Sequence, residues 1–230
     1  MKINEFKLER YFAKHEFTAK YLLSSSDCDG YALPYLLAQA TQNELALWEG
    51  MTLGYTESAG NPLLREAIAQ YYKIKSIENV VVATPGELNF ISMNVLLDPT
   101  DHVVCVSPCY QSLSEIVNAI GCEHSFWKPR SDEWEFDPAG LEKLIQKNTK
   151  LIILNFPHNP TGSYLTQEQL DEVVRLARKH NSYIFSDEMY HKLIADNRPE
   201  IAPIADVYEK GISLWGTSKT FGLAGLRTGW

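Results

Sequence analysis

The segment that decides the fold begins at Lys150-Leu151-Ile152-Ile153-Leu154-Asn155 and ends at Ser186-Asp187. Its first six residues and residues 183–185 are short apolar runs of the kind that form buried strands. Between these runs, Thr166 and Gln169 form a capping box that opens a helix with apolar residues at helical spacing. A strand, a helix and a second strand in this order predict a βαβ unit and a parallel sheet.

The same alternation continues on both sides of this unit. We expect further strands at residues 79–83, 102–106 and 211–215. We expect further helices at residues 3–15, 33–49, 63–72, directly after residue 86, at 111–119 and at 137–147. The chain is therefore predicted to be an α/β protein with three layers, α/β/α, around a mostly parallel sheet.

Polar residues follow most of the predicted strands. In open α/β sheets, ligands bind beyond the carboxyl ends of the strands. The polar segments that follow predicted strands are residues 84–86, 107–110, 155–162, 187–190 and 216–219. We therefore expect these five segments to converge on one rim of the sheet and to form a ligand site there.

The last of these segments leads into the run Ser218-Lys219-Thr220-Phe221-Gly222-Leu223-Ala224-Gly225-Leu226-Arg227. A lysine amine attacks carbonyl groups only when its pKa falls well below the solution value of ~10.4, and an apolar turn with a nearby cation lowers it. The natural partner is an aldehyde that also carries an anion for Arg227. Pyridoxal 5′-phosphate (PLP) is such a molecule.

This run resembles the lysine motif of the class I/II aminotransferases, which are PLP-dependent enzymes of fold type I. Residues 155–162 look like the N-P-x-N-P-T-G loop of that family, and residues 55–68 resemble its Y-x4-G-x3-L-R-x-A-I segment. The resemblance implies a PLP-dependent transferase-like large domain. It also implies that Lys219 binds PLP as an internal aldimine, and that an amino group moves between an amino acid and a 2-oxo acid.

The catalytic residues that the resemblance implies are Lys219, Asp187 and Tyr190. Freed Lys219 acts as general acid and base. A carboxylate at a strand end, here Asp187, pairs with the protonated pyridine nitrogen of the cofactor. Tyr190 and Asn159 bond the phenolic oxygen of PLP. Glu188, beside Asp187, is expected to cap a helix or form a salt bridge.

The remaining cofactor contacts also follow from the resemblance. Tyr110 stacks on the cofactor ring. The phosphate-binding groups are the backbone of Gly86, Glu87 and Leu88 at a helix N-terminus, Ser218, Arg227, and Tyr55 from the partner subunit of a homodimer. One departure is Gly216, where the family commonly has Ser or Thr; Thr217 or Ser218 is then expected to supply the missing hydroxyl.

The composition limits the other partners. A formal net charge of −8 argues against a nucleic-acid or anionic-membrane partner. No stretch approaches the ~20 consecutive apolar residues of a membrane helix, and the first residues contain no apolar signal core. The irregular spacing of Cys28, Cys105, Cys109 and Cys122 favours reduced thiols and gives no metal-ligand pattern. We expect a cytoplasmic protein that acts on small molecules and binds no metal.

The length predicts an incomplete domain. The resemblance covers residues 51–230 as the PLP-binding large domain, which lacks its C-terminal part. Residues 1–50 are expected to be a helical segment of the small domain or dimer arm. We therefore expect a fragment or truncated product of a longer protein, which by itself is inactive or nearly so.

Several alternatives to amino transfer stay open at this point. The same site supports capreomycidine-synthase-like cyclisation or oxidation, lyase chemistry and decarboxylation, and residues 108–111 resemble such PLP enzymes. A non-catalytic PLP-binding module is a further alternative. A P-loop nucleotide hydrolase is disfavoured because two residues separate Gly216 from Lys219 and because the carboxylate strand precedes the lysine.

Overall fold

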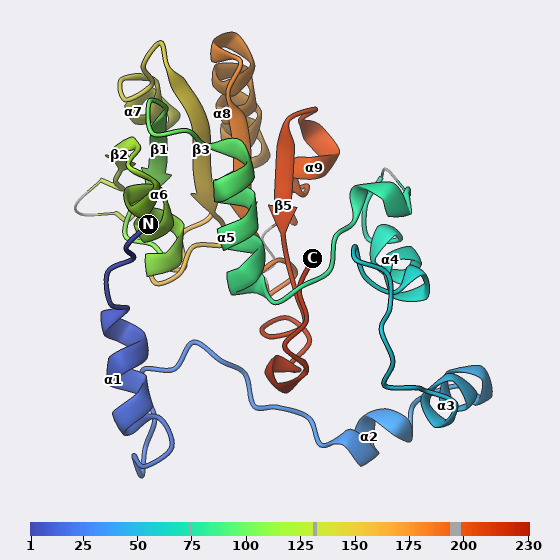
Figure 1. The fold of residues 1–230 in the computed structure, drawn as a ribbon. Coiled ribbons are helices and arrows are strands. Elements are labelled where there is room, and N and C mark those ends of the chain that lie inside the picture. The colour runs from blue at the N-terminus through green and yellow to red at the C-terminus, as the bar shows by residue number, and fades with distance from the viewer. Residues whose placement is uncertain (74, 131–132, 194–198) are drawn as a thin grey trace.

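Five strands form a sheet at the centre of the molecule, in the order β2-β1-β3-β4-β5 (Figure 1). Every neighbouring pair is parallel. The computed structural model describes residues 1–73, 75–130, 133–193 and 199–230. The strands are β1 (His102–Val106), β2 (Glu123–Trp127), β3 (Thr149–Asn155), β4 (Tyr183–Asp187) and β5 (Gly211–Leu214). The predicted parallel sheet is therefore confirmed.

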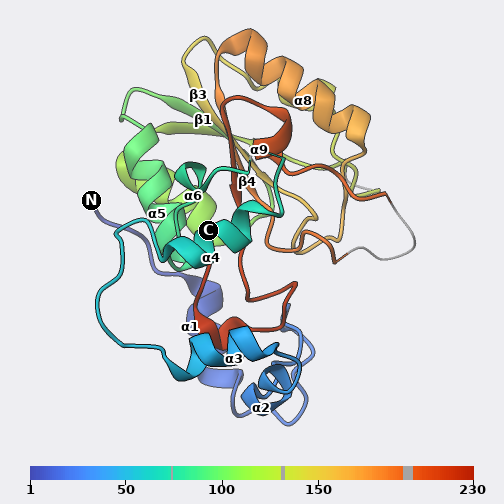
Figure 2. The same cartoon turned by 90° about the vertical axis from the view of Figure 1, so that its right-hand side faces the viewer.

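Helices cover both faces of the sheet (Figures 1 and 2). On one face lie α5 (Pro85–Leu96) and α6 (Gln111–Ile120), which pack on Val103, Cys105 and Leu151. On the other face α7 (Pro138–Glu142) and α8 (Gln167–His180) pack with Val104 and Ile152. Successive strand residues point to opposite faces, so one buried apolar run supplies both cores and gives the three-layer fold.

The βαβ unit that opens at residue 150 forms as its sequence dictates. The Thr166 side chain accepts from the Gln169 amide, and the Gln169 side chain accepts from the Thr166 amide. Asn181 ends α8 in the left-handed conformation, φ 59°. These contacts satisfy polar groups that the ends of the helix would otherwise leave free.

The N-terminal part of the chain lies outside this layered body. It contains α1 (Lys7–His15), α2 (Leu33–Leu37) and α3 (Gln42–Glu49), and none of these helices has a buried residue. Figure 1 shows this blue segment beyond the end of the sheet to which the strand arrows point. It is followed by α4 (Pro62–Ala69), whose first turn is capped by the Asn61 side chain.

Two expectations about the elements need correction, and one strand was not expected. Residues 79–83 do not form a strand of the sheet, because Ile77–Asn79 is a 3-10 helix and Ala83 makes only an isolated antiparallel bridge to Gly229. The helix expected at 137–147 ends at Glu142, and Leu144 bonds Leu141 in a turn instead. The strand β2 was not foreseen, because its residues at the sheet edge are largely polar or exposed.

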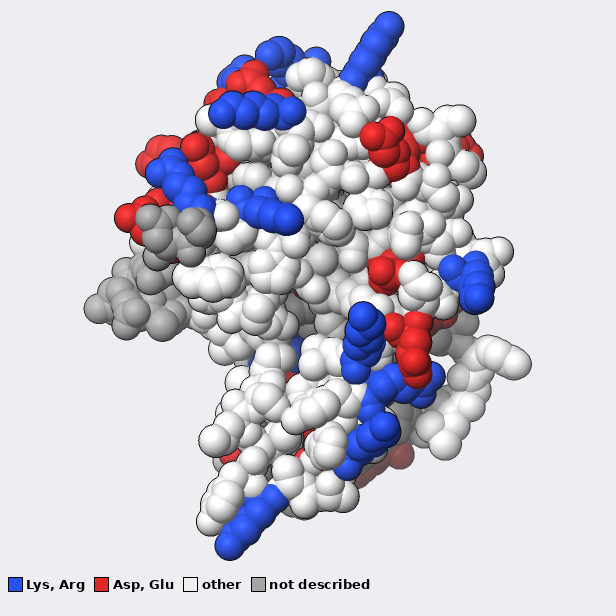
Figure 3. All heavy atoms as spheres, turned by 90° about the vertical axis from the view of Figure 1, so that its left-hand side faces the viewer, with Lys and Arg blue, Asp and Glu red and all other residues white. Residues whose placement is uncertain are grey.

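Three short elements complete the fold, namely the helix α9 (Ile204–Val207) and the 3-10 helices η1 (Ile77–Asn79) and η2 (Ala224–Leu226). Figure 3 shows Lys and Arg side chains interspersed with Asp and Glu over one face of the molecule. Among the described residues, no helix combines the length and the apolar character that crossing a membrane requires.

Candidate active site

The polar segments at the strand ends meet around one cavity of about 340 Å³. Residues from all five predicted segments reach it. The lining residues that the sequence singled out are Gly86, Tyr110, Asn159, Asp187, Tyr190, Ser218, Lys219 and Arg227. The sheet therefore brings together side chains that lie far apart in the sequence, on the rim where the strands end.

Asp187 is the last residue of β4 and lies at the base of this cavity. Its residue is only 6% exposed, and one carboxylate oxygen, Oδ1, accepts from the Met189 amide at 3.2 Å. Burial raises the pKa of the Asp187 carboxyl to about 6, against the opposing effects of the Met189 amide and the Lys219 charge. Such a carboxyl gains its charge most readily when a cationic partner enters the cavity.

The ends of β3 and β4 are joined by a short chain of hydrogen bonds. Asn155 Nδ2 donates to the Asp187 carbonyl at 3.1 Å, and the Asn159 amide donates to Asn155 Oδ1 at 3.3 Å. Asn159 Nδ2 then donates to the Tyr190 hydroxyl at 3.2 Å. The Asn159 amide group and the Tyr190 hydroxyl thus lie side by side. Two neighbouring donors of this kind can both bond one acceptor oxygen. Their predicted role at the phenolic oxygen stays a prediction.

Lys219 lines the same cavity, in the loop that follows β5. Its amine is paired with the carboxylate of Asp27, a residue of the N-terminal segment that sequence reasoning missed. The neighbouring Thr220 fixes the loop, because its hydroxyl donates to the His191 carbonyl at 2.6 Å and accepts from Trp215 Nε1 at 3.1 Å. These two hydrogen bonds of Thr220 fix the loop beside Lys219 and so hold the lysine at the cavity.

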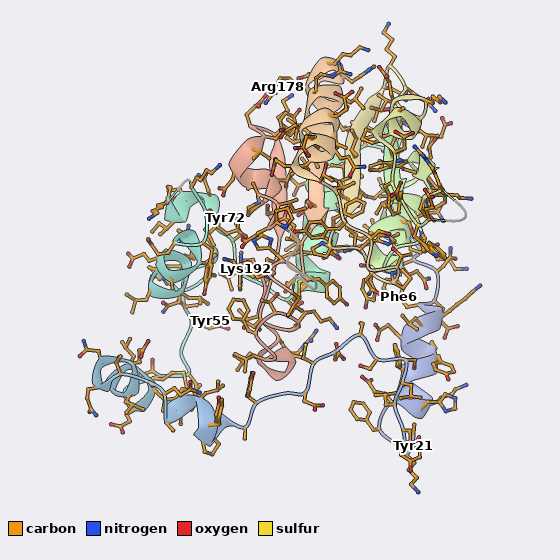
Figure 4. All side chains as sticks on the ribbon, turned by 180° about the vertical axis from the view of Figure 1, so that it is seen from behind. Phe6, Tyr21, Tyr55, Tyr72, Arg178 and Lys192 are labelled. Atoms are coloured by element: carbon orange, nitrogen blue, oxygen red, sulfur yellow. The ribbon has the colours of Figure 1, made fainter. Side chains whose placement is uncertain are left out.

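Tyr110 stands at the N-terminus of α6 and contacts the N-terminal segment. Its hydroxyl donates to Glu9 Oε1 at 2.6 Å, and Phe6 packs edge-on against its ring at 6.0 Å between centroids. Burial, followed by the adjacent Glu9 carboxylate, raises the pKa of Tyr110 above its ordinary value. Figure 4 shows Phe6 where α1 approaches the sheet domain. The predicted stacking on a cofactor ring stays a prediction.

The N-terminus of α5 forms the far end of the cavity. The Thr84 side chain accepts from the Glu87 amide at 3.4 Å, and the Leu88 amide donates to the Thr84 carbonyl at 2.9 Å. Gly86 lines the cavity, whereas the Glu87 and Leu88 amides already have these partners. Of the three predicted backbone contacts, Gly86 is therefore the one whose position fits an incoming anion most directly.

The structure distinguishes the two hydroxyls, of Thr217 and Ser218, that are expected to replace the missing one at Gly216. The Thr217 hydroxyl already bonds two backbone carbonyls, at Leu223 and Thr228. Ser218 lines the cavity beside Arg227. A Cβ at Gly216 would meet the Thr228 carbonyl oxygen at 2.8 Å, so the backbone approach there leaves no room for a serine. Ser218 is thus the hydroxyl that fits the predicted role.

Asn89 is a cavity residue to which the sequence gave no role. It is 2% exposed, and its Nδ2 donates to Ser112 Oγ at 2.9 Å. Its Oδ1 has no hydrogen-bond partner among the described residues. A buried carbonyl oxygen without a partner is unfavourable, and Asn89 is one of the residues that line the same cavity as Asp187 and Lys219.

Two residues with roles predicted from the sequence, Tyr55 and Glu188, do not line the cavity. Tyr55 is fully exposed and is not among the residues that line the cavity. Figure 4 shows it on the segment between α3 and α4. Its predicted contact was with a partner subunit, so this position leaves that prediction open. Glu188 is buried and accepts from the Ile204 amide at 2.9 Å, which caps α9 as expected. Burial raises the pKa of Glu188 to about 7.

His158, to which the sequence gave no chemistry, connects two loops of the site. It is 3% exposed; its Nε2 bonds the Pro108 carbonyl at 2.7 Å and its Nδ1 lies 2.6 Å from Thr161 Oγ1. Burial lowers the pKa of His158. Among the residues that the structure describes, no group of three or more His, Cys, Asp or Glu side chains is placed to hold a metal ion.

The chain is similar to known proteins along most of its length. The profile of the family "Aminotransferase class I and II" matches residues 18–230. An aspartate aminotransferase of Pyrococcus horikoshii is 34% identical over 192 residues, which are 80% of this chain and 49% of that protein. The chain spans about half the length of the curated relatives it matches.

Two solved structures cover the whole chain. A PLP-dependent aminotransferase from Streptococcus suis is 30% identical with a TM-score of 0.91, and the match covers 62% of that protein. A PLP-dependent cyclase is 28% identical with a TM-score of 0.88, and the match covers 60% of it. These likenesses confirm the fold that the sequence predicts.

Proposed function

Because the chain belongs to the class I and II aminotransferase family, we propose that it is the cofactor-binding part of an enzyme that moves an amino group between an amino acid and a 2-oxo acid. Family membership implies PLP as the cofactor. The observation that carries the proposal is the convergence of Lys219, Asp187, Asn159 and Tyr190 on one cavity at the rim of the sheet. These four residues come from three separate segments of the sequence, 155–162, 187–190 and 216–219.

Each of these side chains has a defined task in the proposed reaction. PLP, when bound, supplies an electron sink for the bond that breaks at the α-carbon of the amino acid. The Asp187 carboxylate holds a proton on the ring nitrogen, and Asn159 with Tyr190 offers two hydrogen bonds to the phenolic oxygen. The Lys219 amine would take a proton from the α-carbon of the amino acid and deliver one to the cofactor carbon.

The far end of the cavity is suited to an anion. Gly86 lies at the N-terminus of α5, where free amides and the helix dipole favour negative charge. Ser218 and Arg227 line the cavity from the lysine loop, which is the segment of residues 215–230 that follows β5 and contains Lys219. We assign the cofactor phosphate to this end, which leaves the Lys219 amine and the Asp187 carboxylate to meet the ring.

The organisation of the whole protein is part of the same proposal. Residues 51–230 would form the large domain and residues 1–50 a segment of the small domain or dimer arm. A homodimer with Tyr55 reaching the partner's phosphate is supported by the full exposure of Tyr55. A cytoplasmic location is supported by four cysteine thiols that the structure leaves unpaired.

Trapping the cofactor on its lysine tests the proposal. Purified protein mixed with PLP is expected to show the visible absorption band of a lysine imine. Reduction with borohydride should then fix the cofactor on the peptide that contains Lys219. Lys219→Ala should abolish both signals, whereas the matched variant Lys179→Ala, which removes an exposed lysine of α8, should leave them unchanged. Labelling of another lysine would contradict the proposal.

Cyclisation is a second candidate, which the likeness to the PLP-dependent cyclase favours. Both reactions use the same cofactor groups, so the cavity described above serves either one. Product analysis separates them, because amino transfer converts an added 2-oxo acid into its amino acid whereas cyclisation leaves that acid unchanged.

A further inference from the structure

Two cysteine thiols lie in contact where β1 ends, one residue before Tyr110 of the cavity. Cys105 Sγ and Cys109 Sγ are 3.7 Å apart, and both cysteines are free thiols. Among the described residues, no other two sulfurs of the chain's cysteines are in such contact. Because a disulfide bond joins sulfurs that are about 2.05 Å apart, a small movement would bring this pair to bonding distance.

The two cysteines differ in how firmly the fold holds them. Cys105 lies in β1 between the paired strands β2 and β3, and it is 1% exposed. Cys109 is half-buried and belongs to the segment of residues 107–110 that connects β1 to α6. The sulfurs must approach each other by about 1.7 Å to form a bond. Since the sheet fixes Cys105, we expect the connecting segment to make this movement.

The environment also gives the two sulfurs different reactivities. A thiolate reacts with peroxides, whereas a protonated thiol does so poorly. A hydrogen bond from the Cys105 thiol lowers the pKa of Cys109, and Ser114 acts in the same direction, against burial and the Asp187 charge. The same hydrogen bond and burial raise the pKa of Cys105. Cys109 is therefore the more accessible and the more readily ionised sulfur, and Cys105 lies behind it.

We propose that Cys105 and Cys109 are an oxidation site, which a hydroperoxide such as hydrogen peroxide converts reversibly into a disulfide bond. The Cys109 thiolate attacks one peroxide oxygen; the S–O bond forms, the O–O bond breaks, and the leaving hydroxide takes a proton to become water. The Cys105 thiol then attacks the Cys109 sulfur; the S–S bond forms, the S–O bond breaks, and hydroxide leaves with the Cys105 proton as a second water. Two electrons pass from the thiols to the peroxide, and an external dithiol returns them by exchange.

The disulfide bond would act on the neighbouring tyrosine. Tyr110 follows Cys109 directly, its hydroxyl donates to Glu9 Oε1 at 2.6 Å, and its ring contacts Phe6. A movement of Cys109 toward Cys105 draws Tyr110 with it, because the two residues are consecutive. We therefore expect oxidation to loosen the contact that holds α1 at the cavity. We also expect weaker PLP binding through Tyr110, and this last consequence alone rests on the proposed function.

A count of free thiols tests the proposal without any cofactor. The reduced chain is treated with hydrogen peroxide and then unfolded in urea, and its free thiols are alkylated with iodoacetamide. Of the four thiols, Cys105 and Cys109 should escape alkylation, and dithiothreitol should restore both. Chymotryptic cleavage after Tyr110 separates Cys109 from Cys122 for mass spectrometry. In the oxidised protein, hydrogen exchange of residues 7–15 should become faster by about twofold or more.

Four cysteine variants assign the roles of the sulfurs. Cys109→Ser should prevent the reaction, whereas Cys105→Ala should leave a sulfenic acid on Cys109 that dimedone labels. Cys122→Ser is the matched control, because Cys122 is also buried but contacts the Asp98 carbonyl instead of a second thiol. This control and Cys28→Ser, which removes the exposed thiol, should both still form the disulfide bond. The count on the parent chain decides the proposal even if one variant does not fold.

The other outcomes separate the individual statements. Alkylation of all four thiols, a loss confined to Cys28, or irreversible oxidation of Cys109 with Cys105 still free would overturn the proposal. A disulfide bond that forms without faster exchange in residues 7–15 would overturn its link to Tyr110. The apparent Kd for PLP should rise about threefold or more on oxidation, and an unchanged value would overturn only the link to the cofactor. Absence of the lysine-imine band in the reduced protein would contradict the proposed function and leave the thiol count as it is.

Discussion

The rim of the sheet and the N-terminal segment face each other across one cavity, yet they are built differently. Asn155 and Asp187 at the rim are 2% and 6% exposed and lie in neighbouring parallel strands. The helices α1, α2 and α3 have no buried residue. The comparison indicates that the core fixes the positions of the rim residues, whereas the N-terminal segment can change without disturbing them.

The sharpest test of this contrast is the same substitution, leucine to alanine, made once in the sheet and once in the N-terminal segment. Leu154→Ala in β3 removes a side chain that is 1% exposed and packed in the core. It is expected to lower the free energy of unfolding by about 2–5 kcal/mol, because it leaves a cavity among close-packed neighbours. Leu8→Ala in α1, where the leucine is 49% exposed, is expected to lower it by less than ~1 kcal/mol.

Urea unfolding followed by circular dichroism gives both values under one set of conditions. Similar losses for the two variants would show that the N-terminal segment belongs to the same cooperative unit as the sheet. The distinction between a rim fixed by the core and a separately replaceable N-terminal segment would then be wrong.

The second largest effect concerns the charge buried at the rim. Burial raises the pKa of Asp187 from its ordinary 3.8 to about 6, so the folded protein binds this proton more tightly than the unfolded chain. The contribution of Asp187 to stability is therefore full below pH ~4 and is lost as pH rises through 6. Asp187→Asn keeps an acceptor for the Met189 amide and removes the buried charge.

At pH 8 the cofactor-free Asp187→Asn variant is expected to be more stable than the parent by up to about 3 kcal/mol. At pH 4 the two proteins should have nearly equal free energies of unfolding. Glu188→Gln is the comparison variant, since the pKa of Glu188 is raised to about 7 by burial as well, but Glu188 caps α9. Only Asp187→Asn should also weaken PLP binding; equal stability of parent and variant at pH 8 would contradict the buried charge.

The same contrast explains what the sequence could predict. The strands β1 and β3 are buried on both faces, so their β-branched and apolar runs are visible without any structure. The rim residues Asp187 and Asn159 follow such runs directly. The edge strand β2 has a polar sequence, Glu123-His124-Ser125, and gave no signal. Residues 80–83 have the composition of a strand, but composition does not supply a partner strand.

The contacts between the N-terminal segment and the cavity could not be predicted for a related reason. Asp27 meets Lys219 across 192 positions of sequence, and Glu9 meets Tyr110 across 101. No periodicity or turn signal links residues so far apart, because α1 has no buried face that would fix its position. Sequence motifs predict the residues that the sheet itself positions. They do not predict the position of a segment that is held by a few polar contacts.

The lysine loop is intermediate between the rim of the sheet and the N-terminal segment. Its close packing is visible at Gly216. A Cβ at this position would meet the Thr228 carbonyl oxygen at 2.8 Å and the Gly229 Cα at 3.1 Å. Gly216→Ser is therefore expected to destabilise the fold by about 1–3 kcal/mol and not to improve PLP binding. Gly225→Ser, where an added Cβ has no neighbour within 4 Å, should change stability by less than ~0.5 kcal/mol.

Thermal unfolding of the two serine variants beside the parent measures this difference, and a PLP titration of each measures the second expectation. Tighter PLP binding by Gly216→Ser without loss of stability would show that the loop has room for the hydroxyl that the family commonly has there. The assignment of that role to Ser218 would then fail.

The smallest predicted effect lies at the contact that joins the two regions. Tyr110→Phe removes the hydroxyl that donates to Glu9 Oε1 and keeps the ring that Phe6 contacts. Because one such hydrogen bond contributes about 0.5–1.5 kcal/mol, local opening of α1 should increase roughly 2- to 10-fold. Hydrogen exchange should therefore become faster in residues 7–15 while the amides of β3 keep their rates. Glu9→Gln added to Tyr110→Phe should cause little further change if the two groups act through this bond; independent increases would mean that α1 is held by other contacts.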